Sequence, residues 1–250
     1  MPYTTMELRR DNGTGWIVLN RPEVKNALNI ASFYELRQAI AELEADDSVK
    51  TIVIIGKGGN FSSGRDFRDK TPVPPDFEER RTEAFSALEY CSKPTIAAVA
   101  GWAITGGMTI MMSCDIVIAS EDAILQDTHA KIGAITLRAS RMYELIGPMR
   151  TKELLFTSRR VMAAEAFQMG LVNKVVPREQ LEQAAAEMAA QINQHDPQVV
   201  GAIKKMVNRV IRADQAGMLD REELEKRRFN DLVSEQKAMA RGRDILPGKG

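Results

Sequence analysis

The sequence predicts an α/β fold followed by a helical C-terminal region. Two short apolar runs, Thr51 to Ile55 and Thr95 to Val99, are continuous rather than alternating, which is typical of strands buried on both faces of a sheet. Segments with helical spacing of apolar residues separate such runs in the first half and dominate the rest of the chain. With 250 residues, 44% of them hydrophobic and 27% charged, the chain suits one globular domain with a helical appendage.

The first half is expected to begin with a hairpin. Asp11-Asn12-Gly13 is a strong turn signal between two short strand patterns. Three prolines in residues 71–76 exclude regular structure there. In chain order, the expected strands are Met6 to Arg9, Trp16 to Leu19, Thr51 to Ile55, Thr95 to Val99 and Asp115 to Ala119, and the expected helices are Ile30 to Ala45, Phe77 to Tyr90 and Gly106 to Met112.

The second half is expected to be mainly helical. Gly147-Pro148 separates two helical stretches, and Ala163 to Met169 forms another helix before a last strand at Lys174 to Val176. After Pro177 the pattern is helical nearly to the end. Its main features are two apolar stripes (Leu181, Met188, Ile192; then Val199, Ile203, Val207, Val210), a charged helix over 219–241 and a loose tail, RDILPGKG.

Composition narrows the function classes. Lys plus Arg equals Asp plus Glu at 34 each, so net charge gives no electrostatic case for nucleic acid. The longest apolar stretches contain glycines and fall short of the ~20 residues that span a membrane. The N-terminus lacks the apolar region of a signal peptide, and Cys91 and Cys114 make no disulfide framework. We therefore expect a cytoplasmic protein whose two thiols are buried and inert.

Two glycine-containing junctions are the candidate site. One is FSSGRD (61–66) and the other is AGWAITGG (100–107); each follows a buried strand, where open α/β folds usually bind ligands. Gly106 opens an expected helix, so its N–H would lie at the positive helix end. Two such N–H groups converging on one carbonyl oxygen would form an oxyanion hole. Glycine alone favours ordinary surface loops, because neither junction matches a phosphate-binding signature.

The wider sequence supports a site. Five segments occur in order: VLNRPEVKNALN (18–29), FSSGRDF (61–67), KPTIAAVAGWAITGGM (93–108), CDIVIAS (114–120) and AAEAFQMGLVNKVVP (163–177). Together they resemble the enoyl-CoA hydratase/isomerase, or crotonase, superfamily. The resemblance implies a β-β-α spiral core over residues 1–195 and a helical region over 196–250. In that family the helical region packs on neighbouring subunits, as trimers or dimers of trimers.

The resemblance also implies site residues. The first oxyanion N–H would belong to Arg65 and the second to Gly106, with Thr105 in place of the first glycine of the family's GGG run. The substrate would be an acyl-coenzyme A thioester, with no metal or redox cofactor. Lys25 would either meet a phosphate or be a solvated surface lysine. The implied coenzyme A contacts are Val24, Lys25, Ala27, Arg65, Asp66, Phe67 and Arg68.

Two departures from the family concern its catalytic glutamates. Thr109 stands at the first glutamate position and His129 at the second, and the family's next P-G-x-G-G turn is replaced by a shorter segment. An ordinary histidine titrates near ~6.5, so His129, with Asp127 nearby, is a candidate acid/base. Thr109 could orient water or substrate but cannot act as a base. The competing interpretation makes His129 a packed residue.

The altered turn contains Arg138 and Tyr143, which are weaker site candidates; Tyr143 is expected to pack. The other histidine, His195, is expected in a solvated turn.

The implied chemistry is stabilisation of a thioester enolate. With one evident base, double-bond isomerisation is at least as well supported as hydration, and thioester hydrolysis and decarboxylation stay open. Loss of both glutamates also allows a trimer without catalysis. An RNA-binding homologue is a further alternative, through Arg80-Arg81 and Lys226-Arg227-Arg228, but acidic residues interleave both clusters.

Overall fold

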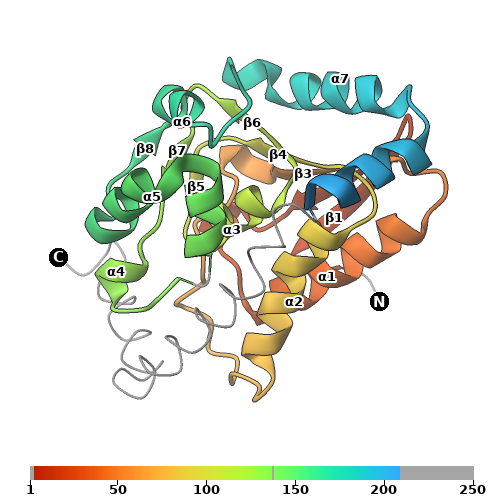
Figure 1. Cartoon of the computed structure of the whole chain (residues 1–250). Coiled ribbons are helices and arrows are strands. Elements are labelled where there is room, and N and C mark those ends of the chain that lie inside the picture. The colour runs from red at the N-terminus through yellow and green to blue at the C-terminus, as the bar shows by residue number, and fades with distance from the viewer. Residues whose placement is uncertain (1–2, 137, 209–250) are drawn as a thin grey trace.

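A six-stranded sheet runs through the centre of the computed structural model, which describes residues 3–136 and 138–208 (Figure 1). Its strand order is β1-β2-β3-β4-β6-β9; β1 and β2 are antiparallel, and the other neighbours are parallel. The β1–β2 turn at Asn12-Gly13 has two positive φ angles, 48° and 78°, as a tight hairpin requires. The strands are β1 (Met6–Asp11), β2 (Thr14–Leu19), β3 (Thr51–Gly56), β4 (Thr95–Val99), β6 (Ile116–Ser120) and β9 (Lys174–Val176).

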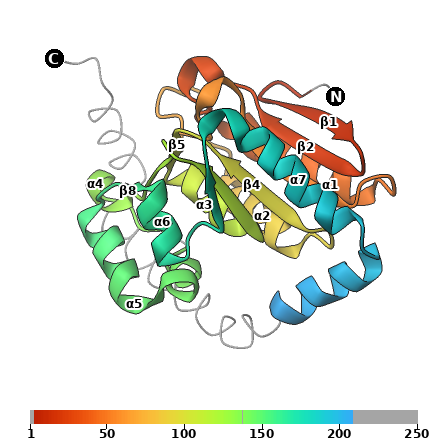
Figure 2. The same cartoon turned by 90° about the horizontal axis from the view of Figure 1, so that it is seen from above.

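Helices cover both faces of this sheet, which explains the continuous apolar strands. Ile52 and Ile54 of β3 belong to the larger core, with α1 (Ile30–Ala45), α2 (Phe77–Tyr90) and α3 (Gly106–Ser113). Val53, between them, belongs to a second core beneath α7 (Leu181–Asn193), which crosses the opposite face (Figure 2). Alternate side chains point to opposite faces, so a strand covered on both sides is apolar throughout.

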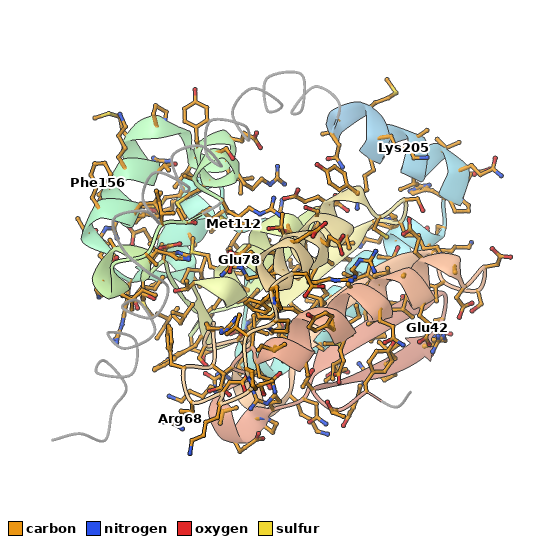
Figure 3. All side chains as sticks on the ribbon, turned by 90° about the horizontal axis from the view of Figure 1, so that it is seen from below. Glu42, Arg68, Glu78, Met112, Phe156 and Lys205 are labelled. Atoms are coloured by element: carbon orange, nitrogen blue, oxygen red, sulfur yellow. The ribbon has the colours of Figure 1, made fainter. Side chains whose placement is uncertain are left out.

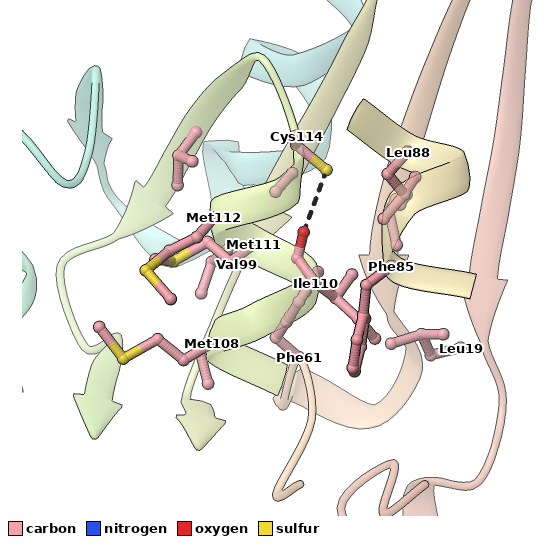
Figure 4. Packing of buried hydrophobic residues seen from close by; sticks show 14 of the residues in the cluster. Leu19, Phe61, Phe85, Leu88, Val99, Met108, Ile110, Met111, Met112 and Cys114 are labelled. Atoms are coloured by element: carbon pink, nitrogen blue, oxygen red, sulfur yellow. Dashed lines mark hydrogen bonds between the residues drawn. The ribbon is translucent and has the colours of Figure 1, made fainter. Parts of the chain in front are cut away.

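The helix α3 is buried almost completely. Its three methionines and Ile110 all belong to the larger core; Figure 4 shows Ile110 on the side of Phe85 and Leu88 of α2, and Met108 and Met112 on the opposite side of α3. The Cys114 thiol that follows lies 3.5 Å from the Ile110 carbonyl oxygen. Cys91 is buried too, and burial raises its pKa to about 11. Both thiols are therefore the inert, buried groups that the sequence predicts.

A second sheet was not evident in the sequence. It joins β5 (Trp102–Ile104), β7 (Ile124–Gln126) and β8 (Val161–Met162) in the order β5-β7-β8. Strands of two or three residues are too short to show alternation, so residues 100–107 read as loop alone. The surrounding helices are α4 (His129–Ile132), α5 (Ala139–Thr157) and α6 (Ala163–Met169), and the short 3₁₀ helices of the chain are η1 (Pro22–Val24), η2 (Lys57–Gly59) and η3 (Arg178–Gln180).

The long helices at Ile30, Phe77 and Ala163 have the expected bounds, and β6 is displaced by one residue from the expected strand. The expected break at Gly147 is a non-helical residue, with φ 75°, inside α5. After α7 the chain turns at His195, which is exposed as predicted. Helical structure then continues over residues 197–208.

The apolar stripe on residues 197–208 faces outward. Val199, Ile203 and Val207 are each more than half exposed. Val210, the charged segment 219–241 with Lys226-Arg227-Arg228, and the tail lie outside the described residues. Within residues 3–136 and 138–208, no helix is long and apolar enough to cross a membrane.

Candidate active site

The loop after β3 is fixed between two other segments of backbone. On one side, Leu28 N donates to Gly64 O at 2.7 Å and Asp66 N donates to Leu28 O at 2.9 Å. On the other side, Ser62 N donates to Trp102 O at 2.7 Å, and Ile104 N to Ser62 O at 2.9 Å. These bonds hold the loop that contains Arg65 beside the residues before α3, although the two segments are far apart in sequence.

Glycines allow this loop and α3 to approach closely. A Cβ atom on Gly64, whose φ is 85°, would lie 2.7 Å from Ile104 O, and one on Gly107 would lie 2.5 Å from Ser62 O. Both distances are too short for any side chain. A Cβ atom on Gly106 would be only 3.8 Å from the backbone nitrogen of Arg65. The structure therefore brings together the two residues whose N–H groups the family resemblance assigned to one oxyanion hole.

The side chains of this loop brace it from within. Asp66 is buried, with its carboxylate 2.9 Å from the Arg21 guanidinium and 3.0 Å from the Arg68 N–H. The Arg65 guanidinium lies over the Phe77 ring, 4.3 Å from its centroid, and so connects the loop to α2. Of the expected coenzyme A contacts in this loop, Asp66 is engaged in the fold, whereas Arg68 is exposed at the edge of the molecule (Figure 3).

The segment before α1 contributes the other expected contacts. Lys25 has a left-handed backbone, with φ 54°, and its Nζ lies 3.6 Å above the Trp102 ring centroid. Lys25 is exposed, and this cation–π contact lays its ammonium group over the aromatic ring at the surface. Ser63 N donates to the Lys25 carbonyl at 2.9 Å, so the turn at Val24 to Ala27 packs directly on the loop after β3.

His129 and Asp127 form a hydrogen-bonded pair where the chain leaves β7. The His129 Nδ1 atom is 3.0 Å from each carboxylate oxygen of Asp127, and the His129 N–H donates to the same carboxylate at 2.9 Å. The Asp127 side chain is 4% exposed and that of His129 is 18% exposed. A buried carboxylate thus orients the ring through Nδ1.

Thr105 connects the two halves of the site. Its hydroxyl lies 2.6 Å from the Thr128 hydroxyl and accepts from the Thr128 N–H at 3.1 Å. Its backbone has φ 48° and ψ −98°, a conformation that favours glycine and typically costs a larger residue about 1–3 kcal/mol. Sequence reasoning did not find this link; the replacement of a family glycine by Thr105 was its only signal.

Thr109 lies one turn into α3 and is buried. Its N–H and its hydroxyl both donate to the Thr105 carbonyl, at 2.9 and 3.0 Å. The hydroxyl proton is therefore committed to the helix, and only the oxygen lone pairs are left for water or substrate.

The altered turn departs from expectation at one residue. Tyr143, expected to pack, is 46% exposed, because it lies on the outer side of α5. Arg138 is buried and pairs with Glu89 of α2 at 2.9 and 3.1 Å, a contact that the sequence did not reveal. The pair Arg80-Arg81 is not an open basic patch, since Arg80 bonds Asp76 and Arg81 bonds Glu78.

Comparison with known proteins agrees with this fold. The enoyl-CoA hydratase/isomerase family matches residues 9–244. A probable enoyl-CoA hydratase of Mycobacterium tuberculosis is 35% identical over 84% of this chain and 83% of its own length. A short-chain-enoyl-CoA hydratase of Clostridium acetobutylicum is 34% identical over 86% of this chain and 85% of its own.

Solved structures agree as well. An enoyl-CoA hydratase of Mycobacterium avium has a TM-score of 0.80 at 30% identity, covering 97% of this chain and all of its own. A monofunctional enoyl-CoA isomerase of M. smegmatis has a TM-score of 0.74 at 29% identity, covering 84% of this chain and 95% of its own.

A β-β-α core with this loop arrangement defines an enzyme that processes acyl-CoA substrates. The chain belongs to the enoyl-CoA hydratase/isomerase family, the crotonase superfamily that its sequence motifs indicate.

Proposed function

We propose that this enzyme stabilises the enolate of an acyl-CoA thioester between the backbone N–H groups of Arg65 and Gly106, with His129 as the acid/base. The approach of Gly106 to the Arg65 nitrogen is the observation that carries the proposal. Gly106 begins α3, so its N–H adds the positive end of the helix to the pair of donors. Preorganised donors of this kind stabilise charge that develops on a carbonyl oxygen, typically by ~10²–10³ in rate for each donor.

Proton transfer falls to His129. Nε2 accepts the proton from the α-carbon, the C–H electron pair forms the enolate double bond, and the thioester oxygen becomes negative between the two donors. Asp127 supports the cationic ring through Nδ1. Returning the same proton to the γ-carbon completes migration of a β,γ double bond to the α,β position, with no other reactant.

Isomerisation is the reaction that these residues support best. Hydration generally uses two groups to hold and activate a water molecule, but Thr109 replaces one of them and its hydroxyl proton is bonded to the Thr105 carbonyl. One base is sufficient to shuttle one proton between two carbons. Thioester hydrolysis on the same scaffold is the second candidate, because an Asp–His pair can also activate water.

Coenzyme A would bind along the turn at Val24, Lys25 and Ala27 and the loop at Arg65 to Arg68. The stacking of Lys25 on Trp102 supports this placement, since it holds a cationic group beside the oxyanion loop. The chemistry needs no metal or redox cofactor. A cytoplasmic location stays a prediction from the sequence.

The subunits are proposed to associate as a trimer or a dimer of trimers. Support comes from apolar side chains that the single chain leaves in solvent, on α5 (Met149, Phe156), on α6 (Phe167) and on residues 197–208 (Val199, Ile203, Met206, Val207). Figure 3 shows Phe156 on the outer side of α5. In this proposal residues 1–195 form the core and 196–250 a helical region that packs on core and neighbour.

Activity measurements on matched substrates test the proposal. A 3-enoyl-CoA, the corresponding 2-enoyl-CoA and a saturated acyl-CoA should be supplied in parallel, with conversion, water addition and free thiol release followed in each. We expect conversion of the 3-enoyl to the 2-enoyl thioester to be fastest, and calorimetry to give tighter binding for a thioester than for its free acid. Faster thiol release would favour hydrolysis, and equal absence of binding for thioester and acid would remove the proposal.

A further inference from the structure

We propose that Thr105 is a positioning residue, which holds the N–H groups of the oxyanion hole and the His129 ring in the correct positions relative to each other. This inference rests on the proposed function. Thr105 immediately precedes Gly106, and Thr128 immediately precedes His129. The two threonines are joined through both a hydroxyl pair at 2.6 Å and the Thr128 N–H at 3.1 Å. One side chain thus connects the residues adjoining both proposed catalytic groups.

The conformation of Thr105 supports a role for its hydroxyl. A positive φ with ψ near −98° suits glycine, yet the position holds a residue with a branched side chain. The side chain is buried and its backbone is fixed as well, because Thr105 N donates to Gln126 O at 2.7 Å. A strained, buried residue whose hydroxyl makes a specific contact beside a site fits a functional rather than a packing role.

Thr128 is the residue through which the contact with Thr105 can act on the His129 ring. It lies between Asp127 and His129, the two members of the hydrogen-bonded pair, at the start of α4. Because α4 has only four residues, the direction of the imidazole depends on how Thr128 is held. Thr109 completes the arrangement by donating twice to the Thr105 carbonyl, so the same residue is fixed from α3.

The test compares Thr105→Ser with Thr105→Ala. Both variants keep a Cβ atom at the same φ, so they share its strain and differ by one oxygen. We expect Thr105→Ala to lower kcat for the favoured thioester by about 10- to 100-fold, with KM nearly unchanged, because small displacements of a catalytic group have effects of that order. Thr105→Ser should keep most of the wild-type kcat. Equal kcat in both variants, whether high or low, would overturn the proposal.

A readout independent of turnover separates this inference from the proposed function. The chain has two histidines, so ¹⁵N-histidine NMR spectra can be assigned with a His195→Gln variant. The His129 ring signals should move in Thr105→Ala and not in Thr105→Ser, while those of His195 stay fixed. If the wild type turns over no thioester but these signals move, the proposed function fails, and the result shows only that Thr105 holds the His129 ring in place.

If Thr105→Ala does not fold, Thr105→Gly takes its place, since glycine accepts the backbone angles without strain. An unchanged His129 spectrum together with wild-type kcat in Thr105→Gly would also overturn the positioning role.

Discussion

The oxyanion loop and the Asp127–His129 pair are two sides of one proposed site, and they are held in different ways. The loop is fixed by backbone hydrogen bonds on both edges and by glycines that allow close contact. The pair depends on side chains, a carboxylate on one ring nitrogen and a threonine contact behind it. Backbone donors tolerate changes of side chain, whereas a proton-transfer group is defined by its side chain. Substitution of a side chain is therefore expected to affect the pair more than the loop.

The largest expected effect comes from changing the Asp127–His129 pair, the part of the site that depends on side chains. His129→Ala should lower kcat by ~10²–10⁴, the usual contribution of a positioned acid/base, with little change in thioester affinity. Steady-state kinetics and calorimetry on the favoured thioester measure the two quantities. His195→Ala is the matched control and should retain activity, because His195 lies exposed in a turn. Full activity in His129→Ala, accompanied by lost stability, would make the ring a packing residue.

The next largest effect is expected at the contact between the loop after β3 and α3, the part of the site that is fixed by its backbone. Gly107→Ala places a methyl group only 2.5 Å from Ser62 O, closer than a carbon and an oxygen atom can approach without a shift. Loop and α3 must separate, so we expect kcat to fall by ~10²–10³, as when one oxyanion donor is lost. Stability should also decrease, by about 1–3 kcal/mol.

Gly147→Ala controls for the loss of stability, because Gly147 has a positive φ but no neighbour near its Cβ position. It should lose stability in denaturant titrations while each folded molecule keeps its turnover. Wild-type kcat in Gly107→Ala would contradict the importance of the close contact.

A smaller effect is expected at Asp127. Asp127→Asn keeps the shape of the side chain but removes the charge that faces His129 Nδ1. We expect kcat to fall by about 10- to 100-fold through misorientation of the ring and loss of support for its cationic form. The test is kcat together with the ¹⁵N-histidine spectrum; a fall in kcat with an unchanged His129 signal would assign Asp127 another role.

The smallest effect should come from Thr109. Thr109→Val keeps the volume and removes one hydrogen bond to the Thr105 carbonyl, so kcat should change by less than about 10-fold. The test is to measure kcat of the wild type and of Thr109→Val on 3-enoyl and on 2-enoyl thioesters. A loss confined to water addition would show that Thr109 orients water, and would raise hydration above isomerisation.

Much of the fold could be predicted from the chain alone. The long helices and buried strands have strong periodic signals, and the bounds of α1, α2 and β4 match their expected ranges. The three short strands of the second sheet could not be found, since their pairing comes from tertiary contacts such as Ala103 with Leu125. Arg65 and Gly106 were identified by resemblance. The Thr105–Thr128 and Arg138–Glu89 contacts join residues far apart in sequence, which one sequence cannot reveal.

In the proposed site, Arg65 would have two separate roles. Its peptide N–H would donate to the enolate oxygen, whereas its guanidinium lies over Phe77, 4.3 Å from the ring centroid. Every amino acid except proline supplies that N–H, so an alanine scan would detect only the loss of the aromatic contact and would record Arg65 as an anchor for α2. The proposed chemical role would be invisible to side-chain mutagenesis. Backbone editing, such as replacing the amide before Arg65 by an ester, is the kind of change that would expose it.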